Sequence, residues 1–201
     1  MRRAARISAL VAALAVAGCG AHAPAPPPGD AGAVRPVLAV LPLENLSGRA
    51  EVGDKLTRIL WTEVGGSGRY EVVEPGEVDA ALADARVRNS LALTRDQIQK
   101  VSRRTGATWL LAGSIVECGN VRTPDGDVPT LALALRVIDG HSGRVRWTEQ
   151  RTRSGEDRET VFGWGRVTNL ARLAHATARD RVGAIRLPAE ADSLVPGGNT
   201  R

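Results

Sequence analysis

Five stretches of the chain carry hydrophobic patterns that are typical of β-strands. Val37–Leu43 and Trp109–Val116 are almost continuously apolar, which indicates strands covered on both faces. Tyr70–Val73 is a shorter apolar stretch. Leucine or valine occupies every second position from Leu131 to Val137, and Val145–Arg151 follows after a glycine-containing turn. These last two stretches therefore predict a β-hairpin.

Four further stretches place apolar residues at helical spacing. Glu51–Val64 is the first, and a run of three glycines and one serine ends it. Pro75–Ala85 begins with a proline, which is favoured in the first turn of a helix. Thr94–Gly106 opens with a Thr-Arg-Asp-Gln capping box. The segment from about Phe162 to Leu187 predicts a long last helix.

The order of these elements, β-α-β-α-α-β-β-β-α, predicts the fold class. It is typical of an α/β (α+β) domain in which about four helices cover a mixed sheet of about five strands. We place this single domain at residues 37–187, a length that is sufficient for one hydrophobic core. Residues 188–201 have no apolar periodicity and are predicted to be a disordered tail.

The N-terminus has the features of a targeting segment. Ile7–Ala17 is an apolar run of eleven residues that follows a short arginine-rich stretch. This length suits a signal peptide and is too short for a membrane-spanning helix. Val16-Ala17-Gly18-Cys19 resembles the bacterial lipobox, which directs lipid attachment to its cysteine. An ordinary secretory signal is the alternative, but it does not account for a cysteine at this position.

The lipobox predicts what becomes of the chain. Residues 1–18 would be removed as a signal peptide, and acyl chains such as palmitate on Cys19 would anchor the protein in the membrane. Gly20 follows Cys19 where an aspartate would retain a lipoprotein at the inner membrane, so the predicted location is the outer membrane, facing the periplasm. Residues 19–36 are rich in proline and alanine and predict an extended linker with a reach of about 50 Å.

Charge argues against nucleic acid as a partner. The full chain has 27 basic and 22 acidic residues, and the signal segment contains three of the arginines and no acid. The mature chain is therefore close to neutral, whereas nucleic-acid binding requires a strongly basic patch. Arginine greatly outnumbers lysine, which together with abundant alanine, glycine and valine is typical of a coding bias.

No pattern in the chain predicts catalysis, a metal site or a cofactor. His22, His141 and His175 fall in the linker, a turn and a helix, without metal-like spacing. Gly65–Arg69 resembles a phosphate-binding loop, but it precedes a strand, so a helix end is the better interpretation. Glu156, Asp157 and Glu159 could act in acid–base chemistry, but their interleaving with arginine favours a solvated loop. We therefore expect a non-enzymatic protein.

Cys118 and the four tryptophans are the remaining candidates for a special role. Cys118 is either a free or intermolecularly paired thiol or, as we prefer, a small buried apolar residue. Trp61 is expected at the boundary of the core and Trp109 within it. Core burial is the preferred interpretation for each tryptophan. Trp164 stands between two glycines that offer little local packing, so among the four it is the candidate for contact with a partner protein.

The chain as a whole resembles a known family. A strand Val-Leu-Ala-Val-Leu-Pro-Leu leads into Glu-Asn-Leu-Ser-Gly, and further on come Arg-Tyr-Glu-Val-Val-Glu-Pro and Gly-Ala-Thr-Trp-Leu-Leu-Ala-Gly-Ser-Ile. Leu-Arg-Val-Ile-Asp-Gly-His-Ser-Gly-Arg-Val then supplies a strand–turn–strand signature. Over residues 36–153 this pattern resembles the curli-assembly (CsgG-type) lipoprotein superfamily. That superfamily is similar in fold to penicillin-binding-protein activator lipoproteins and to the N-terminal domain of the Tol translocation protein.

The resemblance implies a periplasmic domain that works by contact with an envelope protein and assists its assembly, export or activation. It also leaves two alternatives, a subunit of an oligomeric secretion channel and an activator of a penicillin-binding protein. The channel pattern requires an amphipathic membrane hairpin. Here Arg136 interrupts the small-residue face of one strand and the next strand is highly charged, so an accessory lipoprotein is the preferred interpretation. Self-association into a homo-oligomer is a further alternative.

Overall fold

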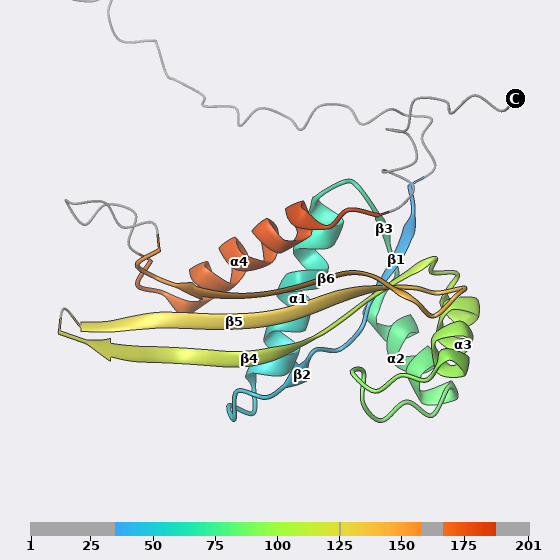
Figure 1. The fold of residues 1–201 in the computed structure, drawn as a ribbon, viewed down its shortest axis with the longest axis horizontal. Coiled ribbons are helices and arrows are strands. Elements are labelled where there is room, and N and C mark those ends of the chain that lie inside the picture. The colour runs from blue at the N-terminus through green and yellow to red at the C-terminus, as the bar shows by residue number, and fades with distance from the viewer. Residues whose placement is uncertain (1–34, 125, 158–166, 188–201) are drawn as a thin grey trace, which may run out of the picture. The chain divides into compact units, whose positions relative to one another are not determined.

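Six strands and four helices are present in the computed structural model, which describes residues 35–124, 126–157 and 167–187 (Figure 1). The strands are β1 (Val37–Val40), β2 (Glu44–Asn45), β3 (Glu71–Val72), β4 (Trp109–Thr123), β5 (Gly126–Asp139) and β6 (Val145–Ser154). The helices are α1 (Val52–Gly66), α2 (Pro75–Asp84), α3 (Arg95–Thr105) and α4 (Leu170–Ala184). The predicted α/β class and element order are confirmed, with β2 as one additional strand.

The strands form one mixed sheet in the order β3-β1-β4-β5-β6, and β2 pairs with β4 beside β1. β1 runs parallel to β3 and to β4, with Leu38 opposite Trp109 and Val40 opposite Leu111. Parallel neighbours need long crossover connections, and the helices supply them here. β4, β5 and β6 are consecutive antiparallel strands, so the predicted hairpin after Leu131 is confirmed.

Several boundaries differ from the prediction. Glu44 lies beyond the predicted first strand but belongs to an additional strand, β2, where it is opposite Ser114. β4 extends to Thr123, seven residues further than predicted, because a bulge between Ile115 and Glu117 shifts the alternation of side chains while strand pairing continues. α4 begins at Leu170, where the Asn169 side chain accepts a hydrogen bond from the backbone N–H of Ala171. Residues 162–166 of the predicted last helix lie outside the described residues.

Local signals account for the other helix ends. The Thr94 hydroxyl accepts a hydrogen bond from the Gln97 backbone N–H, and the Gln97 side chain accepts one from the Thr94 N–H, so the predicted capping box of α3 is formed. α3 ends at Gly106, whose φ of +69° lies in the left-handed region that glycine adopts without strain. Pro75 opens α2 as predicted.

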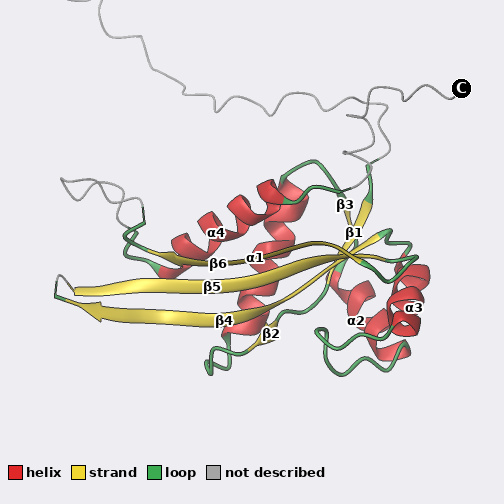
Figure 2. Cartoon of the chain, viewed as in Figure 1, coloured by secondary structure: helices red, strands yellow, loops and turns green. Residues whose placement is uncertain are grey.

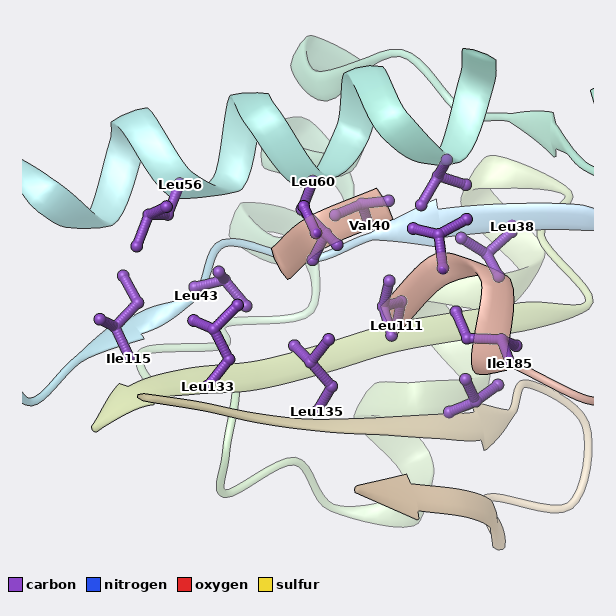
Figure 3. Packing of buried hydrophobic residues seen from close by; sticks show 14 of the residues in the cluster. Leu38, Val40, Leu43, Leu56, Leu60, Leu111, Ile115, Leu133, Leu135 and Ile185 are labelled. Carbon is purple, nitrogen blue, oxygen red and sulfur yellow. The ribbon is translucent and has the colours of Figure 1, made fainter. Parts of the chain in front are cut away.

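The two faces of the sheet carry separate cores. α1 and α4 cover one face, where Leu60, Leu111 and Leu135 are almost fully buried (Figures 2 and 3). α2 and α3 cover the other face over Ala39, Leu110 and Ile138. In Figure 1 the end of β4 and the start of β5 lie at the end of the sheet far from α2 and α3. Within the described residues, none of the helices combines the length and the apolar composition needed to cross a membrane.

Candidate functional site

Cys19 and Trp164 are the two residues for which the sequence predicts a functional role. Both lie outside the described residues. Lipidation of Cys19 and partner contact by Trp164 therefore stay predictions. The other assigned tryptophans are located. Trp109 is buried in the core beneath α1 and α4, as expected. Trp61 is half-buried at the edge of the same core, and its indole N–H donates to the Val73 carbonyl over 3.0 Å.

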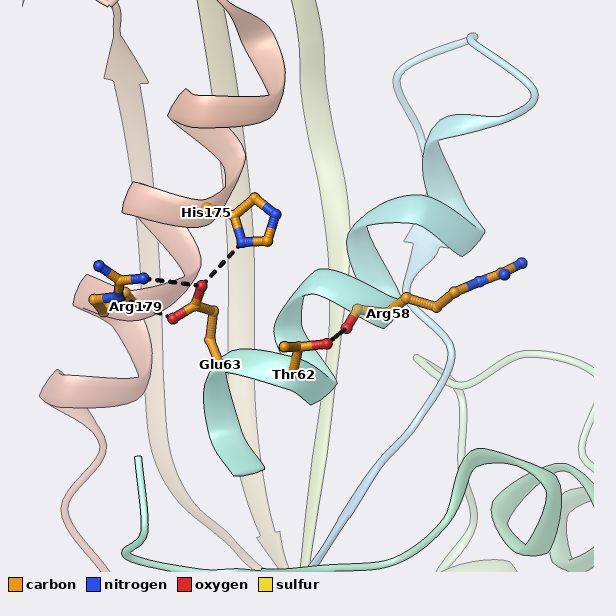
Figure 4. Close-up of polar contacts among 5 residues, drawn as sticks. All are labelled: Arg58, Thr62, Glu63, His175 and Arg179. Carbon is orange, nitrogen blue, oxygen red and sulfur yellow. Dashed lines mark hydrogen bonds and ion pairs between the residues drawn. The ribbon is translucent and has the colours of Figure 1, made fainter. Parts of the chain in front are cut away.

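The best-defined polar cluster joins α1 to α4. Glu63 projects from α1, and its side chain is only 11% exposed. The His175 ring contacts it through Nδ1 at 2.9 Å, and the Arg179 guanidinium donates to both of its carboxylate oxygens, with Nε at 3.0 Å (Figure 4). His175 and Arg179 lie one helical turn apart on α4. The cluster thus attaches α4 to α1 at the surface of their shared core.

The cluster determines the protonation of Glu63. Burial on its own would raise the pKa of Glu63, but the hydrogen bonds and positive charges of Arg179 and His175 outweigh burial and lower that pKa below its ordinary value. A carboxyl group with a lowered pKa stabilises the fold at pH values above its unfolded pKa, about 4.3. This stabilisation is lost as the pH falls through the folded pKa.

Glu63→Gln is expected to lower the free energy of unfolding at pH 7 by about 1 kcal/mol, or the Tm by roughly 3 °C, because charge-assisted hydrogen bonds become neutral ones. Thermal denaturation of both proteins at pH 7 and at pH 3 checks this. The difference between them should shrink at pH 3, which lies below the unfolded pKa of Glu63, so that part of the stabilisation from its charge is lost there. A difference that stays the same at both pH values would contradict the role of the Glu63 charge.

A second set of ion pairs attaches α4 to β6. Arg153 of β6 lies 2.7 Å from Asp180, and Arg181 of α4 pairs with Glu149 of β6. The Arg181 side chain is itself mostly buried, since only 11% of it is exposed. These arginines have a structural function that the sequence interpretation, which attributed them to coding bias, did not find.

Arg136 has a comparable function on the opposite face of the sheet. Its guanidinium donates to the carbonyls of Ser90 (3.3 Å) and Leu91 (2.6 Å) in the loop between α2 and α3. The Ser90 hydroxyl in turn donates to the Pro42 carbonyl, and the Ser90 N–H donates to Glu44. The residue that interrupts the small-residue face of β5 therefore holds this loop against the sheet.

The other titratable candidates have ordinary surroundings. His141 lies in the turn after β5 and His175 in α4, as predicted, and the described residues contain no cluster of three or more His, Cys, Asp or Glu that could hold a metal ion. Asp139 is partly buried, which alone would raise its pKa, but hydrogen bonds from the backbone N–H groups of Ser142 and His141 lower that pKa instead. Asp157 accepts a hydrogen bond from the Ser154 N–H and so closes a turn.

Cys118 is a free thiol buried in β4, in agreement with the preferred interpretation of it as a small apolar residue. Burial raises the pKa of this thiol, and the positive charge of Arg49 opposes that rise without cancelling it. A neutral, enclosed thiol is a poor nucleophile, so Cys118 contributes packing to the core.

The exposed apolar side chains indicate a candidate interaction surface. Four large hydrophobic residues of the described chain are exposed: Leu46, Val116, Val121 and Val145. The first three border one side of β4 beyond the point where β2 ends. We call this side of β4, from residue 117 to 123 together with Leu46 and Val116, the β4 edge. The sequence did not reveal it, because two of its members come from a strand end and a bulge.

Comparisons with known proteins identify solved structures of similar fold. No family model and no curated protein matches the chain. Among solved structures, a PelC dodecamer from Paraburkholderia phytofirmans matches 73% of this chain and 84% of its own, with 18% identity and a TM-score of 0.50. Lipoprotein GNA1162 from Neisseria meningitidis matches 74% of this chain and 99% of its own, with 16% identity and a TM-score of 0.50. The LpoB C-terminal domain from Salmonella enterica matches 62% of this chain and 87% of its own, with 20% identity and a TM-score of 0.46.

The chain therefore shares its fold with PelC and with the lipoprotein GNA1162. The expected resemblance to envelope lipoproteins is confirmed at the level of the fold. Membership of the curli-assembly superfamily stays a prediction.

Proposed function

We propose that this chain is a bacterial outer-membrane lipoprotein of the CsgG-type superfamily that acts without catalysis. Acyl chains on Cys19 would anchor it, and its α/β domain would bind an envelope protein in the periplasm and assist the assembly, export or activation of that partner. The fold shared with GNA1162, itself a lipoprotein, carries the proposal, because it agrees with the independent lipobox signal at Cys19. The linker of residues 19–36 supports it, since a tethered domain with a reach of about 50 Å suits contact with other envelope components.

Affinity isolation from chemically cross-linked membranes tests this proposal. The bait is the full chain, and the control bait is residues 1–36 fused to an unrelated periplasmic domain, which has the same anchor and linker. We expect the full chain to enrich a specific envelope protein that also binds the purified chain in solution. Recovery of nothing beyond the control set would contradict the proposal. Recovery of a penicillin-binding protein would identify the activator alternative.

A second candidate function, a subunit of an oligomeric secretion channel, is favoured by one observation, the dodecameric state of PelC. Electron microscopy and light scattering of detergent extracts distinguish the two candidates. Rings of defined mass would support the oligomer, and a monodisperse monomer would eliminate it.

A further inference from the structure

The backbone of β4 is unpaired on one side over about its last half. β2 pairs with β4 at Ser114 and Ile115, and the Leu46 N–H then donates to the Ile115 carbonyl over 2.9 Å. Beyond that bond, no strand of the described chain lies on this side of β4. Figure 1 shows β4 continuing past β2 with β5 on its other side. The β4 edge is thus a strand edge that β2 begins to cover and then leaves open.

The hydrogen bonds of β5 show which backbone groups of β4 are free. The Gly155 N–H donates to the Pro129 carbonyl over 2.8 Å, so the backbone of Pro129 is directed toward β6. Asn120 lies opposite Pro129, and in an antiparallel ladder such a pair does not exchange hydrogen bonds. The N–H and C=O of Asn120 therefore point out of the sheet at the β4 edge. Cys118 and Arg122 have the same phase and present their backbone groups in the same direction.

The two long edges of the sheet differ in how they are protected. β6, the edge strand at the opposite end of the sheet from β3, carries the exposed side chains of Arg146 and Arg151, and charged side chains are a common means by which proteins prevent strand addition. The β4 edge is bordered instead by apolar side chains, with Leu46 62%, Val116 40% and Val121 45% exposed. Its charges are fewer, and that of Arg122 is offset by Asp127 at 3.6 Å. Within the described residues this edge is open in its backbone hydrogen bonds beyond Ile115, and the Arg49 side chain is a charged group beside it, near Cys118 and Gly119.

We propose that the β4 edge binds an extended segment of a partner protein by strand addition, and that this segment has apolar side chains at alternate positions. The free backbone groups of Asn120 and Arg122 supply the hydrogen bonds, and the apolar border selects the side chains. The inference rests on the proposed function, because it identifies the surface through which the domain meets its partner.

The size of the β4 edge indicates whether its partner is a flexible extended segment or a second folded copy of this chain. Seven residues of strand span about 23 Å, and a strip about 10 Å wide along them covers roughly 230 Å² on each partner. A stable dimer buries roughly 1,200–2,000 Å² in total, so two folded copies meeting only at this edge would lack the necessary area. An extended segment needs less area, because backbone hydrogen bonds supply much of its affinity.

Proline substitutions at the two edges provide a matched test. Asn120→Pro removes one outward N–H from β4, and Gln150→Pro removes one from β6, where Gln150 points outward by the same alternation. Neither change removes a hydrogen bond within the sheet, so both variants should keep the fold. The probe is a fluorescent peptide of alternating threonine and valine flanked by lysines. Its binding to the full chain in detergent is measured by fluorescence anisotropy, and circular dichroism checks folding.

We expect saturable binding to the wild type and to Gln150→Pro, and a loss of affinity of at least tenfold for Asn120→Pro. Amide exchange supplies a second readout that does not depend on that variant. In the wild type, the peptide should slow exchange of the Asn120 and Arg122 amides, whereas the Gly119 amide should already be slow. Absence of saturable wild-type binding, equal affinity of Asn120→Pro, or unchanged exchange at Asn120 would each overturn the inference.

Failure of strand addition at the β4 edge and failure of the proposed partner-binding function give different experimental results. If Asn120→Pro still isolates the same envelope partner from membranes, the partner-binding function stands and the β4 edge is not its site. If the wild type isolates no partner but the peptide binds at Asn120, the edge is a strand-addition site and the proposed function fails.

Discussion

Cys19→Ala is expected to transfer the protein completely from the membrane fraction to the soluble periplasmic fraction. Each acyl methylene contributes about 0.8 kcal/mol to membrane binding, and stable anchoring takes at least two chains, so loss of the acceptor cysteine removes the whole attachment. The fold should persist, because the core begins at Leu38, well beyond the anchor. Fractionation, labelling with an alkyne-bearing fatty acid and circular dichroism measure the three consequences.

Cys118→Ala is the matched control for this experiment. Cys118 is 6% exposed within β4 and is therefore not accessible for lipid attachment. This variant should keep both the label and the membrane location. A Cys19→Ala protein that remains labelled and membrane-bound would show that the lipobox interpretation is wrong, and with it the proposed location.

Gly113→Ala is expected to destabilise the domain by about 3 kcal/mol, which corresponds to a fall in Tm of roughly 10 °C. A Cβ atom at this position in β4 would lie 2.3 Å from the Ala134 carbonyl oxygen and 2.7 Å from the Leu135 side chain. The oxygen belongs to the backbone of the paired strand, so it cannot move away without disturbing the β4–β5 ladder. Thermal denaturation followed by circular dichroism measures the effect.

Gly76→Ala provides the comparison. Gly76 lies in the first turn of α2, and a Cβ there would have no atom within 4 Å. Alanine is also the better helix former, so we expect the Tm to stay within about 2 °C of wild type. A Gly113→Ala variant as stable as Gly76→Ala would mean that β4 and β5 do not approach each other as closely as described.

Local patterns were sufficient to predict most elements of the fold. The capping box at Thr94 and the proline at the start of α2 act within a few residues, so they could be read without knowledge of the partner elements. β2 could not be predicted in this way. It exists because Glu44 and Asn45 pair with Ser114 and Ile115 about 70 residues later, and two residues have no periodicity of their own. The far part of β4 was missed because the bulge after Ile115 breaks the alternation.

The polar contacts were harder to predict for a related reason. Arg179 and Arg181 are two of many arginines in the chain. The amino-acid composition does not distinguish a structural guanidinium from a solvated one. Their partners Glu63 and Glu149 lie on other elements, far away in the sequence. In the sequence, Arg136 is conspicuous only because it interrupts the small-residue face of β5. Its structural role could not be predicted, because the carbonyls that it binds belong to a loop without a recognisable motif. Such contacts depend on tertiary distances, which one sequence does not contain.

The position of α4 has a consequence for how the protein is made. Leu173, Ala178 and Val182 complete the core over β4 and β5, yet α4 is the last described element in the chain. Synthesis proceeds from the N-terminus, so Leu131, Leu133 and Leu135 emerge before the helix that covers them. Until then the nascent domain exposes an apolar sheet face, which makes this interval the one most prone to aggregation and most dependent on chaperones. A product truncated before Leu170 would lack the helix that covers this sheet face and would be left for proteolysis.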